Sequence, residues 1–393
     1  MAALIVGVPL DSFPGERRVA LVPAIVPTLV QKGLDVRIEM GAGASAGFPD
    51  SDYRAQGATL VADRETIYSE ADILLYVNGP GAYSGTSEDE LGLLRRGQFV
   101  VGRLNPLGAP EAARALAERG VTAFALELLP RISRAQPMDV LSSMATVAGY
   151  KAVLLAAAEL GKMFPMMITA AGTVAPARVL VVGAGVAGLQ AIATAHRLGA
   201  VVRAYDVRPA AKEQVESLGA KFIDLDLETD TAEQAGGYAK AMGDAFYRRQ
   251  RELMGEAVAE SDAVVTTAAV PGKRAPVLIT SEMVERMAPG SVVVDLASEG
   301  GGNCELTQPG KTIHAAGVTI VGPINLPSTV PYHASQMLAK NVASFVGTLV
   351  QDGRVGVDME DPILSETLLT RGGEVVHPLV RERLGLPALS AED

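Results

Sequence analysis

The stretch VLVVGAGVAGLQAIATAHRLGAVVRAYD, residues 179–206, decides the fold of the second half of this 393-residue chain. The apolar run VLVV predicts a buried strand, and VAGLQAIATAHRLG predicts a helix that ends at Gly199. Gly183, Gly185 and Gly188 stand at the turn between these two elements. VVRAYD predicts the next strand, so the stretch has the strand–helix–strand order of a parallel α/β layer.

The three glycines match the G-x-G-x-x-G pattern, which is weak alone but is informative at a strand-to-helix turn. Gly183 permits the tight turn, Gly185 lets the backbone approach a pyrophosphate, and Gly188 lets the helix lie close to the strand. Unpaired N–H groups and the positive helix end then hold the phosphate charge. We therefore expect a dinucleotide site made by Gly183, Ala184, Gly185, Val186 and Gly188.

Asp206 ends the next predicted strand, where a carboxylate accepts both ribose hydroxyls and repels a 2′-phosphate. This position favours NAD(H) over NADP(H) as the cofactor. Arg208 is the counter-argument, because an arginine can instead receive the 2′-phosphate. We favour its simpler interpretation as a solvated charge at the start of the next helix. Asp206, Val207 and Arg208 are thus the expected cofactor-binding residues at this strand end.

The first 130 or so residues also alternate short apolar runs with helical patterns, which indicates a second α/β layer with a largely parallel sheet. Its predicted strands are residues 4–8, 36–39, 73–77, 99–101 and 123–125, and its predicted helices are 22–32, 64–69 and 109–119.

After residue 206 the later predicted strands are residues 221–224, 263–267, 291–295 and 319–322, with helices at 210–218 and 238–259. The last 60 residues have helical character at 334–350, and we expect them to pack back on the first domain. The prediction is an α/β chain of two Rossmann-like domains with mostly parallel sheets. The first domain comprises residues 1–135 plus about 330–393, the second comprises 140–328, and NAD(H) lies in the cleft between them.

Composition excludes several classes of function. The net charge of -11 argues against a nucleic-acid or anionic-membrane surface, because both partners are negative. The single cysteine, Cys304, cannot close an internal disulfide and is expected to be a small packed residue. No metal site is expected, because the four histidines are far apart in the sequence: His196, His314, His333 and His377.

The sequence does not predict a secretory signal or a membrane span. The apolar N-terminus has no positive residue ahead of it, as a signal peptide would. Prolines and glycines interrupt the apolar stretch 163–195, so no direct membrane insertion is expected. Within that stretch, Met166 and Met167 are interpreted as core or interface packing. The expected location is the cytoplasm.

The segment PRISRAQPMDVLSSMATVAGYKAV, residues 130–153, is unusually polar for a connection between domains. Its simple interpretation is a capped helix start, in which Asp139 or Ser142 caps a helix running to Leu160. Its functional interpretation follows from its place, since dinucleotides lie where two α/β domains meet. The residue types alone leave both interpretations open.

Several blocks of the sequence resemble the NAD(H)-binding component of proton-translocating transhydrogenase. They are RISRAQPMDVLSS, MMITAAGTVAPARVLVVGAGVAGLQAIATA, EQVESLGAKF, AGGYAKAMG, VLITSEMVERMAPGSVVVDLA and the EGGGNC run. The resemblance extends from about Gly15 to about Asn341. The wider family includes alanine dehydrogenase, whose opening segment is similar to GERRVALVP here.

The resemblance implies direct hydride transfer from NADH to NADP+ on a separate NADP(H)-binding component, coupled to proton translocation by a membrane component. It places Gln136 toward the cofactor of the partner, Asp139 and Ser142 at the carboxamide, and Arg131 as the group that steadies the loop. Further implied cofactor contacts are Ile132, Ser133, Met138, Ala269 and Tyr238, the last in a mobile loop AGGYAKAMG with glycine hinges. Pro137 departs from the small polar residue usual in relatives and stiffens the loop.

The resemblance also implies partners. These are the NADP(H)-binding component and membrane-spanning subunits on separate chains, with this chain a homodimer held at the inner face of the membrane through them. Two alternatives remain. One is an alanine-dehydrogenase-like amino-acid oxidoreductase. In alanine dehydrogenases a lysine and a histidine hold and activate the substrate, but here Tyr76 and Arg103 stand at the matching positions. No histidine precedes His196, which also counts against this alternative. The other is a non-catalytic NAD(H)-sensing module.

Overall fold

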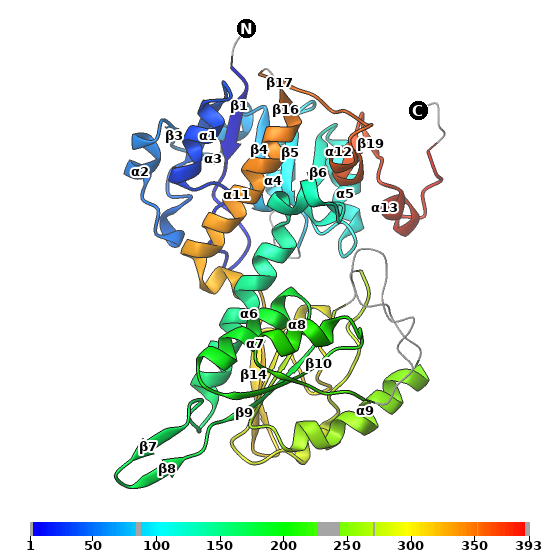
Figure 1. Cartoon of the computed structure of the whole chain (residues 1–393). Coiled ribbons are helices and arrows are strands. Elements are labelled where there is room, and N and C mark those ends of the chain that lie inside the picture. Colours follow the sequence, from blue (N-terminus) through cyan, green and yellow to red (C-terminus); the bar gives the residue numbers. More distant parts are fainter. Residues whose placement is uncertain (1–2, 84–87, 226–243, 270–271, 352, 390–393) are drawn as a thin grey trace. The chain divides into compact units, whose positions relative to one another are not determined.

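The computed structural model describes residues 3–83, 88–225, 244–269, 272–351 and 353–389. The chain divides into two compact units (Figure 1). Unit 1 is Met1–Met144 with Ser328–Asp393, and unit 2 is Ala145–Pro327. Each unit is built on one large sheet whose neighbouring strands are mostly parallel, so the predicted two-domain α/β fold class is confirmed.

The sheet of unit 1 has eight strands in the order β19-β18-β6-β5-β4-β1-β2-β3. The pairs among β1 to β6 are parallel, whereas β18 and β19 add antiparallel pairs at one edge. The strands are β1 (Ile5–Val8), β2 (Asp35–Glu39), β3 (Thr59–Val61), β4 (Ile73–Asn78), β5 (Phe99–Arg103), β6 (Thr122–Ala125), β18 (Leu368–Arg371) and β19 (Glu374–Val375). All six residues of β4 are buried, as expected for a strand covered on both faces.

Because β18 pairs with β6, the last part of the chain does pack back on the first unit, as the sequence predicted. The helical elements of unit 1 are η1 (Pro23–Ile25), α1 (Val26–Val30), η2 (Ala44–Ala46), α2 (Asp50–Ala55), α3 (Arg64–Glu70), α4 (Glu88–Leu93), α5 (Pro110–Glu118), η3 (Leu126–Leu128), η4 (Ser133–Met138), α11 (Pro331–Leu349), α12 (Pro362–Thr367) and α13 (Pro378–Arg383). A short hairpin, β16 (Val350–Gln351) and β17 (Arg354–Val355), follows α11.

The predicted helix 22–32 is wrong as a single element, because it divides into η1 and α1. Pro27 has no N–H to donate to the carbonyl of Pro23, so the i to i−4 ladder cannot run through this point. Several short elements of unit 1 were not predicted, among them α2 and the edge strand β3. Short edge elements carry too little apolar periodicity to predict a strand or helix.

The sheet of unit 2 has seven strands in the order β11-β10-β9-β12-β13-β15-β14. Only β14 runs antiparallel to its neighbour. The strands are β9 (Arg178–Val182), β10 (Val201–Tyr205), β11 (Lys221–Phe222), β12 (Ala263–Thr266), β13 (Val292–Asp295), β14 (Lys311–Ala315) and β15 (Val318–Gly322). β9 is central and β10 and β12 flank it, so their carboxyl ends meet at one edge of the sheet.

The helices of unit 2 are α7 (Val186–Arg197), α8 (Ala211–Ser217), α9 (Asp244–Ala259), α10 (Ser281–Glu285) and η5 (Ser298–Gly300). The short η6 (Leu326–Thr329) crosses the boundary with unit 1. The helix predicted over 238–259 is confirmed from Asp244 onward, and residues 238–243 lie outside the described residues. β14 was not predicted. Its residues alternate polar and apolar at the sheet edge, where burial is incomplete.

The apolar stretch near residue 167 forms an exposed hairpin of β7 (Met167–Thr169) and β8 (Gly172–Val174), which extends away from the sheet of unit 2 (Figure 1). Met166 is 58% exposed and Met167 is 41% exposed. Core packing, one of the two interpretations of these methionines, is therefore wrong. Gly172, the first residue of β8 after the turn, has a φ of +122°, which is in the region that favours glycine.

Helix α6 (Val140–Glu159) links the two units along the chain. Within the part of the chain that the structure describes, it is the one helix long and apolar enough to cross a membrane by length and composition. A core helix of a globular protein has the same properties. Gly149 on α6 approaches α7 so closely that a Cβ there would lie 2.0 Å from the carbonyl oxygen of Ala187.

Candidate functional site

The turn between β9 and α7, called the fingerprint turn below, is shaped by the three glycines of the G-x-G-x-x-G pattern. Gly183 has a φ of +98°, a backbone conformation that favours glycine. A Cβ on Gly188 would lie 1.8 Å from the carbonyl oxygen of Gly183, so glycine is required where the helix meets the strand. A Cβ on Gly185 would meet nothing within 4 Å. The turn thus leaves open space at the position expected to face a pyrophosphate.

The first turn of α7 suits an anionic ligand. Gly185 is the N-cap residue, so no side chain caps the helix. The neighbouring Val186 is 44% exposed, whereas Ala184 is buried at 1% exposure. An uncapped helix start offers backbone N–H groups and the positive end of the helix dipole to an anion. The residues present therefore fit the pyrophosphate of a dinucleotide.

Asp206 directly follows β10, and its carboxylate joins that strand end to the fingerprint turn. Its Oδ2 accepts a 2.6 Å hydrogen bond from the backbone N–H of Ala184. Its Oδ1 accepts one of 2.8 Å from the backbone N–H of Arg208. The side chain of Asp206 is only 5% exposed. This is the position at which a Rossmann fold presents an acid to a ribose.

Arg208 is not a solvated charge, so the favoured interpretation of this residue is wrong. Its Nε donates to Oδ1 of Asp206 at 2.9 Å, and its Nη2 donates to Oδ2 at 3.0 Å. The side chain of Arg208 is 17% exposed. The turn after β10 folds the side chain of Arg208 back onto Asp206, two residues earlier, and so keeps most of it from solvent. Val207, between them, is half-buried.

Thr267, for which the sequence predicted no role, follows β12 and supports the fingerprint turn from the neighbouring strand. Its Oγ1 donates to the carbonyl of Gly183 at 3.0 Å. Asn303 then fixes the following residues: its Oδ1 accepts from the N–H of Ala268 at 2.9 Å, and its Nδ2 donates to the carbonyl of Ala268 at 2.8 Å. Ala269, an expected cofactor contact, comes next in the chain and is exposed. The glycine-rich run SEGGGNC was the available signal for Asn303.

Asp295 at the end of β13 is a fully buried carboxylate that organises this glycine-rich loop. Its Oδ2 accepts from the backbone N–H groups of Asn303 and Cys304 at 2.7 and 2.9 Å. Its Oδ1 accepts from Thr266 Oγ1 at 2.8 Å. Cys304 is 1% exposed, which confirms it as a packed residue, and burial raises the pKa of its thiol to about 11.

Three of the four polar residues expected at the nicotinamide come together in unit 1. Asp139 caps α6, because its Oδ1 accepts from the N–H of Ser142 at 2.9 Å. Its Oδ2 accepts from Ser142 Oγ at 2.6 Å and forms an ion pair with Arg131. The capped helix start predicted from residue types is therefore confirmed, with Asp139 as the cap. The same carboxylate gathers Arg131 and Ser142 into one polar cluster.

The remaining residues of this loop differ in exposure. Gln136, Ile132 and Ser133 are exposed, whereas Met138 is buried at 6% exposure. Gln136 lies on η4, three residues before the Asp139 cluster. Its side chain is thus presented at the surface of unit 1. The side chain of Met138 packs into the unit and anchors the loop.

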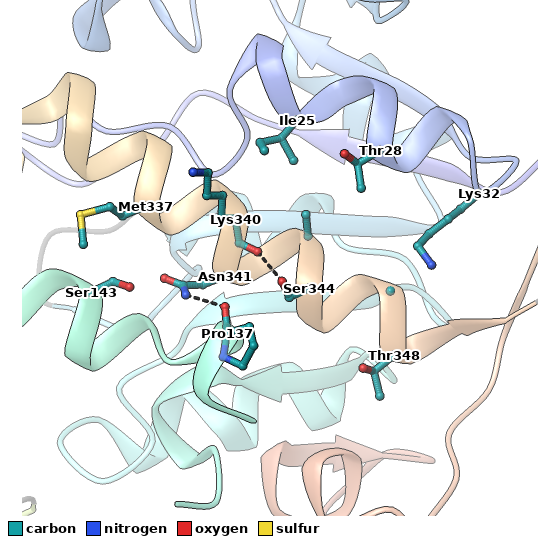
Figure 2. A pocket seen from close by; sticks show the side chains of 12 residues that line it. Ile25, Thr28, Lys32, Pro137, Ser143, Met337, Lys340, Asn341, Ser344 and Thr348 are labelled. Carbon is teal, nitrogen blue, oxygen red and sulfur yellow. Dashed lines mark hydrogen bonds between the residues drawn. The ribbon is translucent and has the colours of Figure 1, made fainter. Parts of the chain in front are cut away.

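A groove of about 740 Å³ lies beside the loop that contains Pro137, between α1, α11 and the start of α6 (Figure 2). Asn341 on α11 is 6% exposed and donates from Nδ2 to the carbonyl of Pro137 at 2.7 Å. Pro137 and Ser143 line the groove together with Lys340 and Asn341. The loop is therefore held from behind by a helix about 200 residues later in the chain.

The strand ends of unit 1 carry a second polar network. Arg103 at the end of β5 donates to Asn78 Oδ1 at 3.3 Å and to the Tyr83 hydroxyl at 2.7 Å. Arg18 is paired with Glu16 at 2.6 Å, and neither side chain is exposed. Tyr76 is buried, and desolvation raises the pKa of its hydroxyl well above the ordinary range.

The expected mobile loop AGGYAKAMG, with Tyr238, lies outside the described residues. Over the described ranges, no group of three or more His, Cys, Asp or Glu side chains is arranged to hold a metal ion. The expected cofactor cleft between the two domains stays a prediction.

Known proteins share this sequence and fold over almost the whole chain. Residues 7–148 match the family described as alanine dehydrogenase/PNT, N-terminal domain, and residues 152–378 match its C-terminal domain. The first part of the NAD(P) transhydrogenase alpha subunit of Rhodospirillum rubrum is 51% identical over 377 residues, covering 95% of this chain and 98% of the relative. The alanine dehydrogenase of Mycolicibacterium smegmatis is 30% identical over 395 residues, covering 99% of each chain.

A solved transhydrogenase structure from Sinorhizobium meliloti has a TM-score of 0.82 and 45% identity, covering 95% of this chain and 99% of that one. These matches confirm the resemblance carried by the sequence blocks. They also show that alanine dehydrogenases are the more distant relatives. The chain belongs to the alanine dehydrogenase/PNT family and, within it, groups with the alpha subunits of NAD(P) transhydrogenase.

Proposed function

We propose that this chain binds NADH and presents it for direct hydride transfer to NADP+ held by a separate NADP(H)-binding component. Proton translocation is coupled to this step by a membrane component. The observation that carries the proposal is the hydrogen bond from the backbone N–H of Ala184, in the glycine-rich turn, to the carboxylate of Asp206. This bond places an acid suited to a ribose beside an uncapped helix start suited to a pyrophosphate. Relatives of the chain are transhydrogenase subunits.

NADH, when bound, supplies the hydride. The residues of this chain hold the dinucleotide and orient it. The turn at Gly183, Gly185 and Gly188 binds the pyrophosphate, and Asp206 binds the adenosine ribose. Because hydride transfer between two nicotinamides moves no substrate proton, the site needs orientation and exclusion of water rather than a general base.

The polar cluster of Arg131, Asp139 and Ser142 is proposed to fix the nicotinamide carboxamide and its ribose. Asp139 presents two acceptor oxygens and Ser142 a hydroxyl, which complement an amide group. Gln136, exposed on η4, is proposed to reach toward the cofactor of the partner component. Ile132, Ser133, Met138, Val207, Ala269 and Tyr238 are proposed as further cofactor contacts.

The proposed assembly is a homodimer of this chain in the cytoplasm, held at the inner face of the membrane by its partner subunits. Several relatives are named as the first portion of a divided alpha subunit, which supports partnering with further transhydrogenase subunits. Other relatives carry this portion within a longer alpha subunit, of which the present chain covers 72% in one case.

The test is NADH-dependent reduction of an NADP+ analogue, with this chain alone and with a purified NADP(H)-binding component. We expect turnover only in the mixture. NADH binding without turnover in either case would favour an NAD(H)-sensing module. Reduction of NAD+ by an amino acid with this chain alone would favour the alanine-dehydrogenase-like enzyme.

A further inference from the structure

The carboxylate of Asp206 is already saturated with hydrogen bonds. Its Oδ1 accepts from the backbone N–H and the Nε of Arg208, at 2.8 and 2.9 Å. Its Oδ2 accepts from the backbone N–H of Ala184 and from Nη2 of Arg208, at 2.6 and 3.0 Å. A carboxylate offers about four acceptor positions, so four donors fill it.

These four donors divide into two kinds. The N–H groups of Ala184 and Arg208 belong to the backbone of two turns, and they hold the carboxylate in place. The guanidinium of Arg208 sits at the end of a long side chain that is 17% exposed, so its departure would leave both backbone donors in place. The two adjacent hydroxyls of a ribose need the same two acceptor positions as Nε and Nη2.

We propose that the Arg208 guanidinium is an internal competitor for the ribose site, which must leave Asp206 before NADH can bind there. This inference rests on the proposed NADH binding and adds a residue that regulates it. Arg208 is then a specificity-determining residue, because a ligand replaces it only by supplying two hydroxyl donors at once. A 2′-phosphate in place of one hydroxyl brings negative charge toward Asp206 and leaves that replacement incomplete.

The ion pair also compensates the cost of burying the carboxylate of Asp206. The side chain of Asp206 is 5% exposed, and an unpaired buried carboxylate is costly. The ion pair with Arg208 compensates that cost until the cofactor arrives. Release of the guanidinium to solvent then leaves the carboxylate to the ribose hydroxyls and the two backbone donors.

The experiment compares Arg208→Leu with a matched control, Arg203→Leu, in the full chain. Arg203 lies on β10 and also forms a bridge, with Nη1 2.8 Å from Glu260, but does not contact Asp206. NADH binding is followed by its fluorescence, at equilibrium and by stopped flow, over a range of NADH concentrations. NADPH binding is measured in parallel.

We expect Arg208→Leu to lower the Kd for NADH about tenfold, which is about 1.4 kcal/mol. NADPH affinity should not rise, because Asp206 then repels the 2′-phosphate without a counterion. Side-chain release is fast compared with NADH binding, so it acts as an equilibrium ahead of binding, and removing it should raise the apparent association rate in Arg208→Leu. Arg203→Leu should behave as the unaltered chain in both affinity and association rate.

Unchanged or weaker NADH binding by Arg208→Leu, with its melting temperature retained, would overturn the inference, because it would give Arg208 a supporting role instead. An equal gain in NADH affinity in Arg203→Leu would also overturn it. Failure of the unaltered chain to bind NADH at all would instead contradict the proposed function. Arg208→Lys is a second variant for the case in which Arg208→Leu does not fold. Lysine keeps the charge but cannot make the two-point contact of Nε and Nη2 with the carboxylate, so Arg208→Lys should also show tighter NADH binding.

Discussion

The side-chain amide of Asn341 on α11 donates a 2.7 Å hydrogen bond to the backbone carbonyl of Pro137 on η4 (Figure 2). Asn341 is buried, and its Oδ1 has no hydrogen-bond partner in the described structure. The bond joins the C-terminal part of unit 1 to the loop that carries Gln136 and Asp139. The position of this loop thus depends on a residue far away in the sequence.

Replacing Asn341 with Leu should therefore impair hydride transfer more than folding. The lost hydrogen bond costs about 1 kcal/mol, and removal of the unpartnered Oδ1 offsets part of that cost. We expect hydride transfer to slow by roughly tenfold, within the loss that a small misplacement of reacting groups causes. The measurements are single-turnover transfer with the partner component, NADH titration and thermal unfolding.

Ser344→Ala is the matched control for Asn341→Leu. Ser344 lies one turn further along α11 and lines the same groove, but its Oγ donates to the carbonyl of Lys340 rather than to the loop. We expect it to leave hydride transfer unchanged. Equal slowing in the two variants would mean that α11 acts through general packing and not through the bond to Pro137.

Asp139→Asn and Gln136→Asn should each slow hydride transfer more than they weaken NADH binding, because orientation rather than binding is at stake. Asn can still cap α6 at position 139, so the melting temperature should change little. The Asp139–Arg131 pair is partly exposed, which limits its contribution to stability. Measured losses of equal size in transfer rate and NADH affinity would show that these residues serve binding alone.

Gly185→Ala and Gly188→Ala should separate a ligand contact from a packing contact within one turn. The added Cβ at Gly188 would overlap the carbonyl of Gly183, so we expect a loss of about 1–3 kcal/mol in unfolding free energy. At Gly185 the added Cβ meets open space, so stability should be retained. NADH affinity should still fall at least about tenfold there, or about 1.4 kcal/mol.

These two variants are compared by denaturant unfolding and NADH titration, with Gly161→Ala as a control whose added Cβ also meets nothing within 4 Å. Retained NADH affinity in Gly185→Ala would contradict the placement of a pyrophosphate at that turn. Full stability of Gly188→Ala would contradict the close approach of α7 to the end of β9.

Asp11 should make the free energy of unfolding fall between about pH 4 and pH 6. Burial raises its pKa from 3.8 to about 6, with nearby Glu16 acting in the same direction. The folded state therefore holds a proton that the unfolded state has lost, so this contribution is complete below pH 3.8 and disappears as pH rises through 6. The full effect is roughly 3 kcal/mol at about 1.36 kcal/mol for each pKa unit.

The check is urea unfolding of the chain and of Asp11→Asn across that pH range. The Asn variant cannot ionise, so its unfolding free energy should fall less steeply with pH. Asn keeps one acceptor oxygen for the two backbone N–H groups, of Phe13 and Asn78, that bond Asp11. An identical pH slope in the two proteins would assign the effect to other carboxyl groups.

The sequence predicted most of the elements that position the candidate site. The periodicities of VLVV and VVRAYD predicted β9 and β10 with their boundaries nearly unchanged. The cap at Asp139 was also predictable, because a side chain that accepts from an N–H three residues later is a local relationship. The short edge strands β3 and β14 were missed, because their pairing depends on a finished sheet more than on their own pattern.

The partners of the charged residues could not be predicted in the same way. Arg208 was interpreted as a solvated charge, yet its guanidinium folds back on Asp206. One of the two interpretations of Met166 and Met167 placed them in the core, yet both are exposed at the β7–β8 hairpin. In both cases residue type suggested one environment, and the local turn geometry decided another.

The sequence by itself determined where the backbone must turn tightly, since the need for glycine at Gly183 and Gly188 follows from steric limits within a few residues. It also determined the alternation of strands and helices, because apolar period is a local property. Only the tertiary structure decided that Asn341 holds Pro137, that Thr267 supports Gly183 and that Arg208 occupies Asp206. These contacts form because folding brings particular strand ends and helices within hydrogen-bonding distance of one another, and no local sequence pattern specifies which of them will meet.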